Sequence, residues 1–252
     1  MNLAINNVSL LFATALVGIA LIVVYKEKLG LGKDILISVV RAVVQLVAVG
    51  YLLGYVFKLN NVVLTLALVL VIIFNASYTA GKKSNGIANA FKISFIAILS
   101  ATSLTLVVLI LSGSVLFIPS QVIPVSGMIA SNSMIAIGIC YRNLNAKFKD
   151  QRQQVLEMLS LGANLKQASI SIVRDSIRSG MLPTIESAKT IGIVSLPGMM
   201  SGLMFAGVDP TDAIKYQIMV TFMLLSTTSI ASVIASYMAY KEFYTASKQL
   251  KN

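Results

Sequence analysis

The sequence of 252 residues contains no histidine and a single cysteine, Cys140. Without histidine there is no imidazole to ligate a metal or act as a general base, and one cysteine excludes an intramolecular disulfide. Charged residues make up only 12% of the chain, far below the share in an ordinary soluble domain, whereas hydrophobic residues make up 57%. We therefore expect a polytopic membrane protein with little equipment for catalysis.

Several motifs of enzymes are also missing. No G-x-x-x-x-G-K-[ST] occurs, so the chain has no P-loop with which to bind a nucleotide by itself. Neither G-x-S-x-G nor H-E-x-x-H is present, and no pair of aspartates lies within an apolar segment. We predict that the chain is not an enzyme and holds no cofactor of its own.

The net charge of +11 is large, but it does not indicate nucleic-acid binding. The basic residues occur in short runs between apolar segments, which is the distribution that the positive-inside rule produces in membrane proteins. We expect the lipid bilayer, and not a nucleic acid, to be the surrounding partner.

Seven apolar segments are long enough to cross a bilayer, which needs about 20 residues. The predicted spans are residues 5–25, 35–57, 61–80, 92–113, 122–142, 184–207 and 216–240. Because the N-terminus lacks the basic region and cleavage pattern of a signal peptide, the first segment is expected to remain as a span. The predicted fold is an all-α transmembrane helix bundle that forms a single domain, residues 1–252.

The loops differ strongly in basic residues. The loops after the first, third and fifth spans and the C-terminal segment together carry 16 of the 20 Lys and Arg residues. The opposite loops contain only Lys58 and Lys215, together with Asp209 and Asp212. The N-terminus is therefore predicted to lie outside, and the loop after the fifth span and the C-terminus to be cytoplasmic.

Residues 147–183 form the one long segment suited to water. Two helical patterns, each with an apolar stripe, flank Gly162-Ala163-Asn164, and Gly180 and Pro183 are expected to end the second. The pattern predicts a cytoplasmic helical hairpin that faces either a soluble partner or the lipid surface. The hairpin mixes acidic residues with its Lys and Arg residues, namely Asp150, Glu157 and Asp175. A purely lipid-bound role is therefore the weaker alternative.

Two charged residues within the predicted spans can be read in two ways. Arg41 is about 10 Å past Asp34 along a helix, so its side chain can reach the interface as an anchor. The alternative is a buried ion pair with Glu186. However, Lys189 lies three residues from Glu186 and can pair with it within one helix.

Polar and small residues near the membrane midplane are candidates for a solute pathway. Asn132 and Met134 lie in the fifth predicted span, where an unpaired amide is costly, so Asn132 is expected to form a hydrogen bond between helices or to line a pathway. Pro197-Gly198 predicts a kink or break of the sixth span at similar depth, next to Met199. Gly198, together with Gly202 and Ala206, forms a small face that suits helix packing, a dimer interface or contact with the substrate. The methionines could ligate Cu(I), but they are equally ordinary apolar filler.

Four segments resemble the FetB (YbbM) family of membrane proteins, and the resemblance covers almost the whole chain. They are MIASNSM (residues 128–134), SLGANLKQA (160–168), IGIVSLPGMMSGLMFAGVDP (191–210) and AIKYQI (213–218). The family is the permease half of a bacterial ATP-binding-cassette (ABC) system linked to iron export, and is similar to plant membrane proteins of aluminium tolerance.

The resemblance implies a location in the bacterial cytoplasmic membrane, a second copy of the chain, and a separate cytoplasmic ATPase that binds the ATP. It also implies that the hairpin couples the two proteins, and Glu157 and Gly162 look like a remnant of the importer motif E-A-A-x-x-x-G. The residues expected to form this coupling element are Glu157, Leu161, Gly162, Ala163 and Asn164.

Alternatives remain at this point. A secondary transporter or channel would work without an ATPase, but it predicts an acid near the midplane, and Glu186 is shallow. The resemblance implies iron as the solute, whereas a nucleotide sugar, considered for the plant relatives, could meet Arg41 or Lys189. A metal would have to be held by amide, hydroxyl and backbone oxygens, as a chelate, or weakly in transit.

Overall fold

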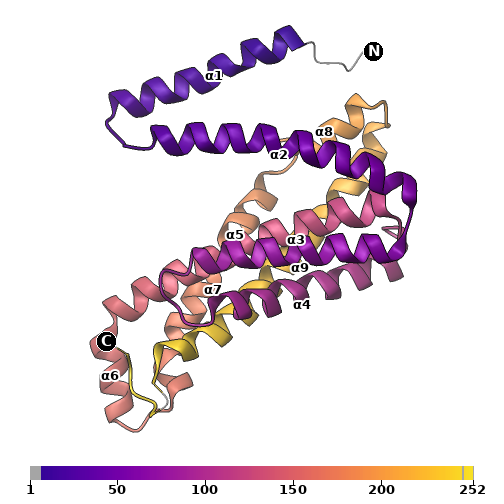
Figure 1. The fold of residues 1–252 in the computed structure, drawn as a ribbon. Coiled ribbons are helices and arrows are strands. Elements are labelled where there is room, and N and C mark those ends of the chain that lie inside the picture. The colour runs from indigo at the N-terminus through magenta and orange to yellow at the C-terminus, as the bar shows by residue number, and fades with distance from the viewer. Residues whose placement is uncertain (1–6, 246, 252) are drawn as a thin grey trace. The chain divides into compact units, whose positions relative to one another are not determined.

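The computed structural model describes residues 7–245 and 247–251, and these residues form α-helices with no β-strand among them. The helices, shown in Figure 1, are α1 (Asn7–Lys26), α2 (Gly32–Leu59), α3 (Val62–Lys82), α4 (Ala90–Leu111), α5 (Pro119–Asp150), α6 (Arg152–Ser160), α7 (Leu165–Thr190), α8 (Gly198–Phe205) and α9 (Pro210–Ala239), followed by the short 3-10 helix η1 (Tyr240–Phe243).

Five helices are long and apolar enough to cross a membrane within the described part of the chain, namely α2, α3, α4, α5 and α9, the last together with η1. They correspond to five of the seven predicted spans. The first predicted span begins at residue 5, outside the described residues, and α1 contributes only the shorter apolar stretch Phe12–Lys26. The sixth, 184–207, is not one helix, because the chain leaves the helix after Thr190 and re-enters one at Gly198.

The chain forms two compact units, Met1–Asn60 and Asn61–Asn252. The first unit consists of α1 and α2, which run antiparallel to each other (Figure 1). The short connection includes Gly30, whose φ of +70° lies in the left-handed region that glycine adopts without strain.

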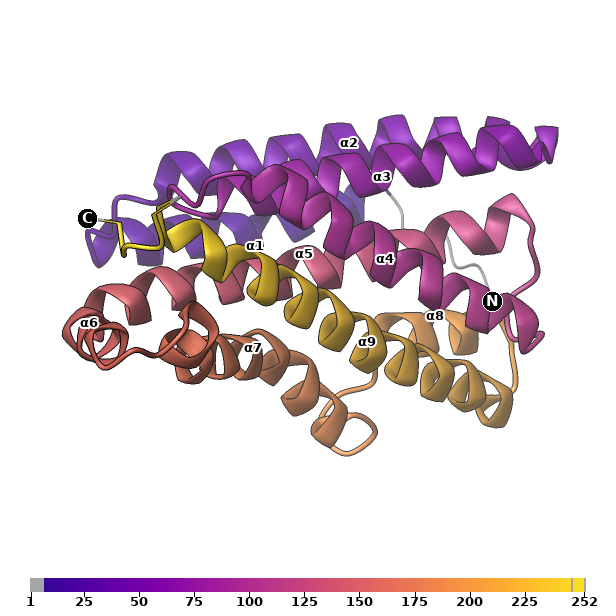
Figure 2. The ribbon, with the colours of Figure 1, turned by 90° about the horizontal axis from the view of Figure 1, so that it is seen from below.

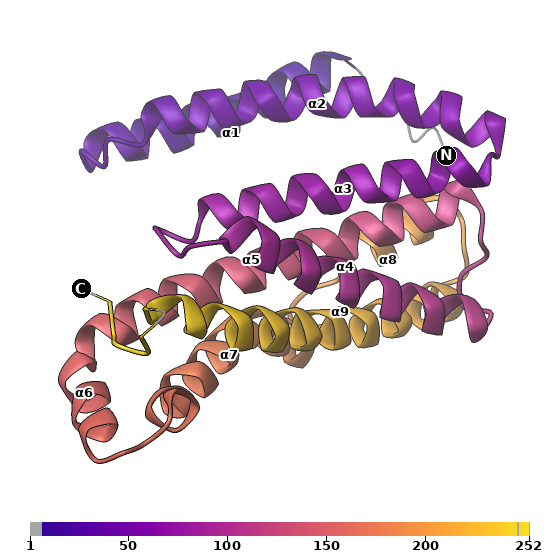
Figure 3. The same ribbon diagram turned by 60° about the horizontal axis from the view of Figure 1, so that its bottom comes forward.

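In the second unit, α5 and α9 are the central helices. Helix α5 packs against α3, α4, α7 and α9, while α9 also packs against α4, α7 and α8 (Figures 2 and 3). Asn61 begins this unit as the N-cap of α3, because its side chain accepts hydrogen bonds from the backbone N–H groups of Val63 and Leu64.

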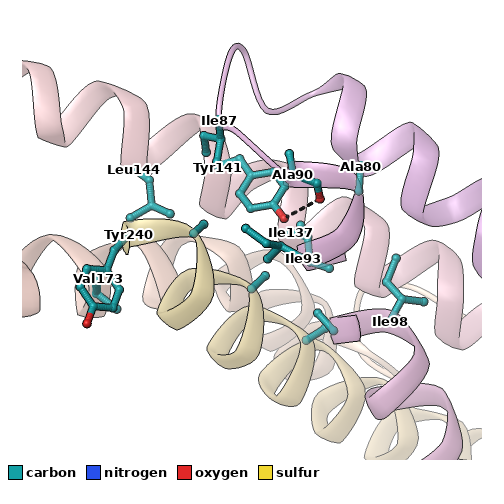
Figure 4. Packing of buried hydrophobic residues seen from close by; sticks show 14 of the residues in the cluster. Ala80, Ile87, Ala90, Ile93, Ile98, Ile137, Tyr141, Leu144, Val173 and Tyr240 are labelled. Carbon is teal, nitrogen blue, oxygen red and sulfur yellow. Dashed lines mark hydrogen bonds between the residues drawn. The ribbon is translucent and has the colours of Figure 1, made fainter. Parts of the chain in front are cut away.

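The core of the second unit combines small residues with a few large side chains. Alanines such as Ala80 and Ala90 let the helices approach closely, and Ile137 and Tyr141 fill the space between them (Figure 4). The hydroxyl of buried Tyr141 donates a hydrogen bond to the carbonyl of Ala90 at 3.3 Å. Close packing of this kind holds α3, α4, α5 and α9 as one bundle.

Helix α7 corrects one expectation from the sequence. Gly180 and Pro183 were expected to end the second helix of the hairpin, yet α7 continues through both and stops only at Thr190. Gly180 lies where α7 crosses α5 and α9, and a Cβ there would be 2.9 Å from the Ala136 carbonyl oxygen. The glycine therefore serves close packing and does not terminate the helix.

Three segments meet at one end of the second unit. The α3–α4 loop, α6 and the C-terminal segment lie at one end (Figures 2 and 3). Hydrogen bonds connect these parts, because Asn145 donates to the Ser84 carbonyl at 2.6 Å and Asn89 donates to Glu242 at 3.3 Å. This end carries the loops for which the basic residues predict a cytoplasmic location.

Candidate functional site

The segment between α7 and α8 is a break in the helical backbone. Gly192 has a φ of +84°, and the N–H groups of Ile193 and Val194 both donate to the carbonyl of Thr190. Pro197, which has no N–H group to continue a helical pattern, precedes the first residue of α8. The break was predicted at Pro197-Gly198, and the structure places it over the preceding residues, 191–197.

A cavity of about 230 Å³ opens beside this break, between α5, α7, α8 and α9. It is lined by Met128, Thr184, Ser187, Ala188, Ile191, Pro197, Met199, Gln217, Val220, Thr221 and Leu224. All four helices contribute to it, so movement of α7 against the bundle would change its shape.

Gln217 is the most unusual residue of the lining. Its side chain is only 5% exposed, yet its Oε1 atom has no hydrogen-bond partner within the described chain. An amide buried without a partner costs about 1 to 3 kcal/mol. Because this oxygen has almost no accessible surface, a molecule in the cavity does not reach it in this arrangement.

Two hydroxyl groups of α7 also line the cavity. Thr184 is half-buried and Ser187 is exposed, and neither makes a side-chain hydrogen bond to a described residue. Thr221 of the same lining, by contrast, donates to the Gln217 carbonyl at 2.8 Å. The cavity therefore brings together one buried amide and two hydroxyls on residues that are not buried.

The cavity unites only some of the residues proposed from the sequence. Pro197 and Met199 line it, whereas Gly198 is exposed outside it. Asn132 donates to the Met128 carbonyl at 2.8 Å within its own helix, and Met134 packs against the main hydrophobic core. In this structure, therefore, Asn132 makes a bond within one helix and not between helices.

The two charged candidates are placed as follows. Lys189 Nζ donates to Glu186 Oε1 at 2.8 Å, the pairing within one helix that their spacing allowed. Both side chains are exposed, so the pair contributes little to stability. Arg41 belongs to the N-terminal unit, on α2.

The predicted coupling residues lie in the turn between α6 and α7. Gly162 has a φ of +89°, and Leu161 beside it is 88% exposed. Asn164 caps α7 through a capping box, in which its side chain accepts from Gln167 N and its own N–H donates to the Gln167 side chain. The turn is thus stabilised by the cap of α7 and exposes an apolar side chain.

The C-terminal segment contacts the helices on both sides of this turn. Tyr244 is buried, and its hydroxyl lies 2.5 Å from the hydroxyl of Ser169 on α7. Burial raises the pKa of Tyr244, while the hydrogen bond with Ser169 lowers it by less. On α6, Arg152 donates to the Lys251 carbonyl. Phe148 stacks on Phe243, with ring centroids 4.2 Å apart.

Sequence reasoning missed Gln217, Thr184 and Ser187 as cavity residues. Gln217 was placed at the very edge of the predicted span 216–240, where an amide is solvated. Helix α9 begins earlier, at Pro210, so Gln217 is seven residues, or about 10 Å, inside the helix. The sequence does carry a turn and N-cap signal at Asp209-Pro210, and an amide two turns into an apolar helix is the feature that could have identified Gln217.

The described residues contain no group of three or more carboxylate or thiol side chains that could hold a metal ion. The cavity lining offers uncharged oxygens and two thioethers, of Met128 and Met199. Such an arrangement can bind a polar solute reversibly, but it supplies neither a general base nor a nucleophile.

Known proteins resemble the chain over almost its full length. It is 57% identical over 98% of its length, and 95% of the relative's, to the "Probable iron export permease protein FetB" of Escherichia coli strain K12. It is 33% identical to the "UPF0014 membrane protein STAR2" of Oryza sativa, covering 95% of the chain and 84% of the relative, and 31% identical to "Protein ALUMINUM SENSITIVE 3" of Arabidopsis thaliana, covering 95% and 88%. No solved structure matches the chain.

These relatives, together with the five apolar helices, confirm a multi-pass protein of the bacterial cytoplasmic membrane with a role in transport. They also confirm the resemblance stated from the sequence. Residues 7–244 match a family described as "Uncharacterised protein family (UPF0014)", and the chain belongs to this family of membrane proteins.

Proposed function

We propose that the chain is the membrane-spanning permease subunit of an ABC transporter, which uses ATP hydrolysis by a separate cytoplasmic ATPase to export a solute. The observation that carries this proposal is the turn at Gly162. The cap of α7 stabilises this turn, and the exposed side chain of Leu161 suits contact with a protein partner. The chain itself has no P-loop, so the nucleotide must be bound by that partner.

Helix α7 gives the proposal a mechanism. It begins beside the turn, at Leu165, and its last turns line the cavity with Thr184 and Ser187. Its 26 residues span about 39 Å as one continuous helix. When the ATPase subunits close and displace the turn, α7 carries the displacement to the cavity and changes its access.

A second copy of the chain is part of the proposal. The segment between α7 and α8 exposes Ile193 and Val194 by 88% and 78%. Irregular backbone at membrane depth is tolerated only where protein or a water-filled pathway covers it, because lipid cannot satisfy its polar groups. If two copies faced each other across the pathway, the second copy and the water in the pathway would together cover this segment.

Iron or another metal is the proposed solute, on the strength of the name of the Escherichia coli relative. The cavity agrees with export in one respect. Its uncharged lining would bind a metal weakly enough to release it on the far side of the membrane.

The substitution Leu161→Ser tests the coupling role. Leu161 is exposed and supports no core, so the variant should insert and fold normally but lose most of its ATP-driven transport. Losing an apolar contact of about 1.5 to 3 kcal/mol would weaken ATPase binding by roughly tenfold or more. Transport into inverted vesicles and co-purification of the ATPase provide the measurements.

Leu116→Ser is the matched control, because Leu116 is also exposed but lies in the α4–α5 loop at the opposite end of the unit. It should leave transport unchanged. If Leu161→Ser transports as well as the unmodified chain, the turn is not the coupling element. Transport that persists without any ATPase would instead support a secondary transporter or channel.

A further inference from the structure

We propose that a groove between α4 and α9 binds one phospholipid molecule, with an acyl chain along the floor of the groove and the phosphate beside Lys215. The lipid belongs to the leaflet that meets the α4–α5 loop. This inference does not rest on the proposed function, because it needs only the bilayer around the bundle and no ATPase. It assigns a ligand to a surface that the proposed function leaves unused.

The groove has a volume of about 530 Å³ and lies where α4 and α9 pack against each other (Figure 2). Its floor consists of the buried residues Thr105, Leu109 and Met223. An empty hollow loses van der Waals contacts, so within a bilayer it is filled either by hydrocarbon or by protein. Its walls are exposed apolar side chains, namely Leu104, Val108, Ile218 and Phe222.

The length and width of the groove favour a lipid over a helix. From Lys215 to Ser226 the groove follows α9 for about 16 Å, close to one leaflet, which is half of a hydrocarbon core of about 30 Å. A transmembrane helix of a second copy would need a face as long as the whole span. The mean cross-section is about 30 Å², well below the roughly 80 Å² of a helix that is about 10 Å wide. An acyl chain therefore fits the groove, and a helix does not.

Polar groups are concentrated at one end of the groove. Lys215 is the one charged residue among the described lining residues, and Ser114 lies at the same end, beyond the last residue of α4. Farther along, the hydroxyl of Thr105 is buried and not presented to the groove, which leaves Ser226 as the accessible hydroxyl. The change from charge at one end to hydrocarbon along the rest matches a phospholipid.

Lys215 retains the capacity to bind a phosphate. Its Nζ donates to Asp212 Oδ1 at 2.9 Å, but both side chains are exposed, so this pair contributes little to stability. An ammonium group has three N–H donors, and two of them remain for phosphate oxygens. Lys215 lies five residues, or about 7 Å, from the start of α9, and its flexible stem lets the ammonium reach the level of the headgroups.

Tryptophan fluorescence tests the inference, because the chain contains no tryptophan. Phe222→Trp places a single indole in the wall of the groove. The full chain is reconstituted in phosphatidylcholine nanodiscs that contain an increasing fraction of a lipid brominated on its acyl chains, since bromine quenches an indole that it contacts. Half-maximal quenching should need about fivefold less brominated phosphatidylglycerol than brominated phosphatidylcholine, as expected for one lysine near the membrane surface.

Phe74→Trp is the matched control. Phe74 is 56% exposed and Phe222 is 67% exposed, and each lies twelve residues from the start of its helix, α3 or α9. The control measures the general attraction of anionic lipid to a basic protein, and it should respond almost equally to the two lipids.

Two further substitutions in the Phe222→Trp chain should act in opposite directions. Lys215→Gln should abolish the preference for phosphatidylglycerol, because it removes the cation. Asp212→Asn should increase the preference, because it removes the carboxylate that competes for Lys215. Both side chains are exposed, so neither change should lower the midpoint of thermal unfolding.

Three results would overturn the inference. Equal quenching of Phe222→Trp by the two lipids would mean random contact with the bilayer. A preference that persists in Lys215→Gln would place the phosphate elsewhere. If Phe74→Trp is quenched and Phe222→Trp is not, protein and not lipid covers the groove. None of these measurements involves ATP or an ATPase, so they do not depend on the coupling role of Leu161.

Discussion

Single residues of the second unit decide how closely its helices pack, and Gly180 is the clearest case. A Cβ at this position would lie 2.4 Å from Cys140 Sγ and 2.9 Å from the Ala136 carbonyl oxygen. The thiol can rotate, but the backbone of α5 cannot move without repacking the bundle. The pattern of a glycine near a proline suggested a helix end, whereas the structure uses the glycine for a helix crossing.

We therefore expect Gly180→Ala to destabilise the protein. Overpacking costs about 1 to 3 kcal/mol, which exceeds the gain of about 1 kcal/mol from replacing glycine in a helix. The midpoint of thermal unfolding in detergent measures the effect. Gly127→Ala is the control, because nothing lies within 4 Å of a Cβ there, and it should not lower the midpoint. Equal midpoints for the two variants would contradict this account.

Asn164 shows how a residue predicted for function can have a clear structural role. It was grouped with the coupling residues on account of the resemblance, and the structure makes it the N-cap of α7. Replacing such a cap by alanine typically costs about 1 kcal/mol. A variant that loses transport at Asn164 should therefore be compared with Asn164→Asp, because aspartate can also cap the helix. Only a loss that Asn164→Asp shares would indicate a contact with the partner.

Among the elements, the long apolar helices and the presence of a break in the sixth segment were predictable, but the extent of that break was not. Helices α2, α3, α4, α5 and α9 match predicted spans because about 20 apolar residues in a row allow few other structures. The sixth segment contains Glu186, Lys189 and several glycines and serines, but composition alone could not show that the chain unwinds over residues 191–197. Pro197 indicated a break, but its extent depends on Gly192 and on backbone bonds to Thr190 that no pattern reveals.

The cavity was only partly predictable for a related reason. Pro197 and Met199 were candidates because they flank a predicted break. Gln217 became a candidate only when α9 and α7 were seen to meet, because a buried amide without a partner is a property of the packed structure and not of the sequence. Polar residues near the ends of predicted spans can therefore line a cavity, as those at the midplane can.

The C-terminal segment leads to a prediction about pH. Burial raises the pKa of Tyr244 above its ordinary value of 10.0. A raised pKa in the folded state means that the neutral phenol stabilises the contact with Ser169 fully below pH 10, and that this stability is lost as the pH rises through the folded-state pKa. The segment should therefore detach from α7 only in strong alkali.

Ultraviolet titration of tyrosinate, as the difference between the unmodified chain and Tyr244→Phe, isolates this one phenol. It should titrate above pH 10.0. Ser169→Ala should raise the value further, because it removes the hydrogen bond that opposes the shift. A difference curve centred at the ordinary value would show that the segment is not held against α7 in solution.

For the whole molecule, the distribution of charge predicts the orientation in the membrane. The α6–α7 turn and the C-terminal segment share one end of the second unit, and the α4–α5 loop lies at the other (Figure 2). Lys147 and Arg152 lie at the first end. At the other end, Asp209 is the N-cap of α9 and Asp212 lies in its first turn. The positive-inside rule therefore predicts that the Gly162 turn lies on the cytoplasmic side, where an ATPase could reach it.

Single cysteines test this orientation directly. Cys140 is fully buried, so it should not react and can remain in place. Leu161→Cys and Leu116→Cys place exposed thiols at opposite ends of the same unit. A membrane-impermeant maleimide should label Leu161→Cys only in inverted vesicles and Leu116→Cys only in intact cells, with the unmodified chain as the blank. The reverse pattern would put the turn outside the cell, where no ATP is available, and would rule out its role in coupling.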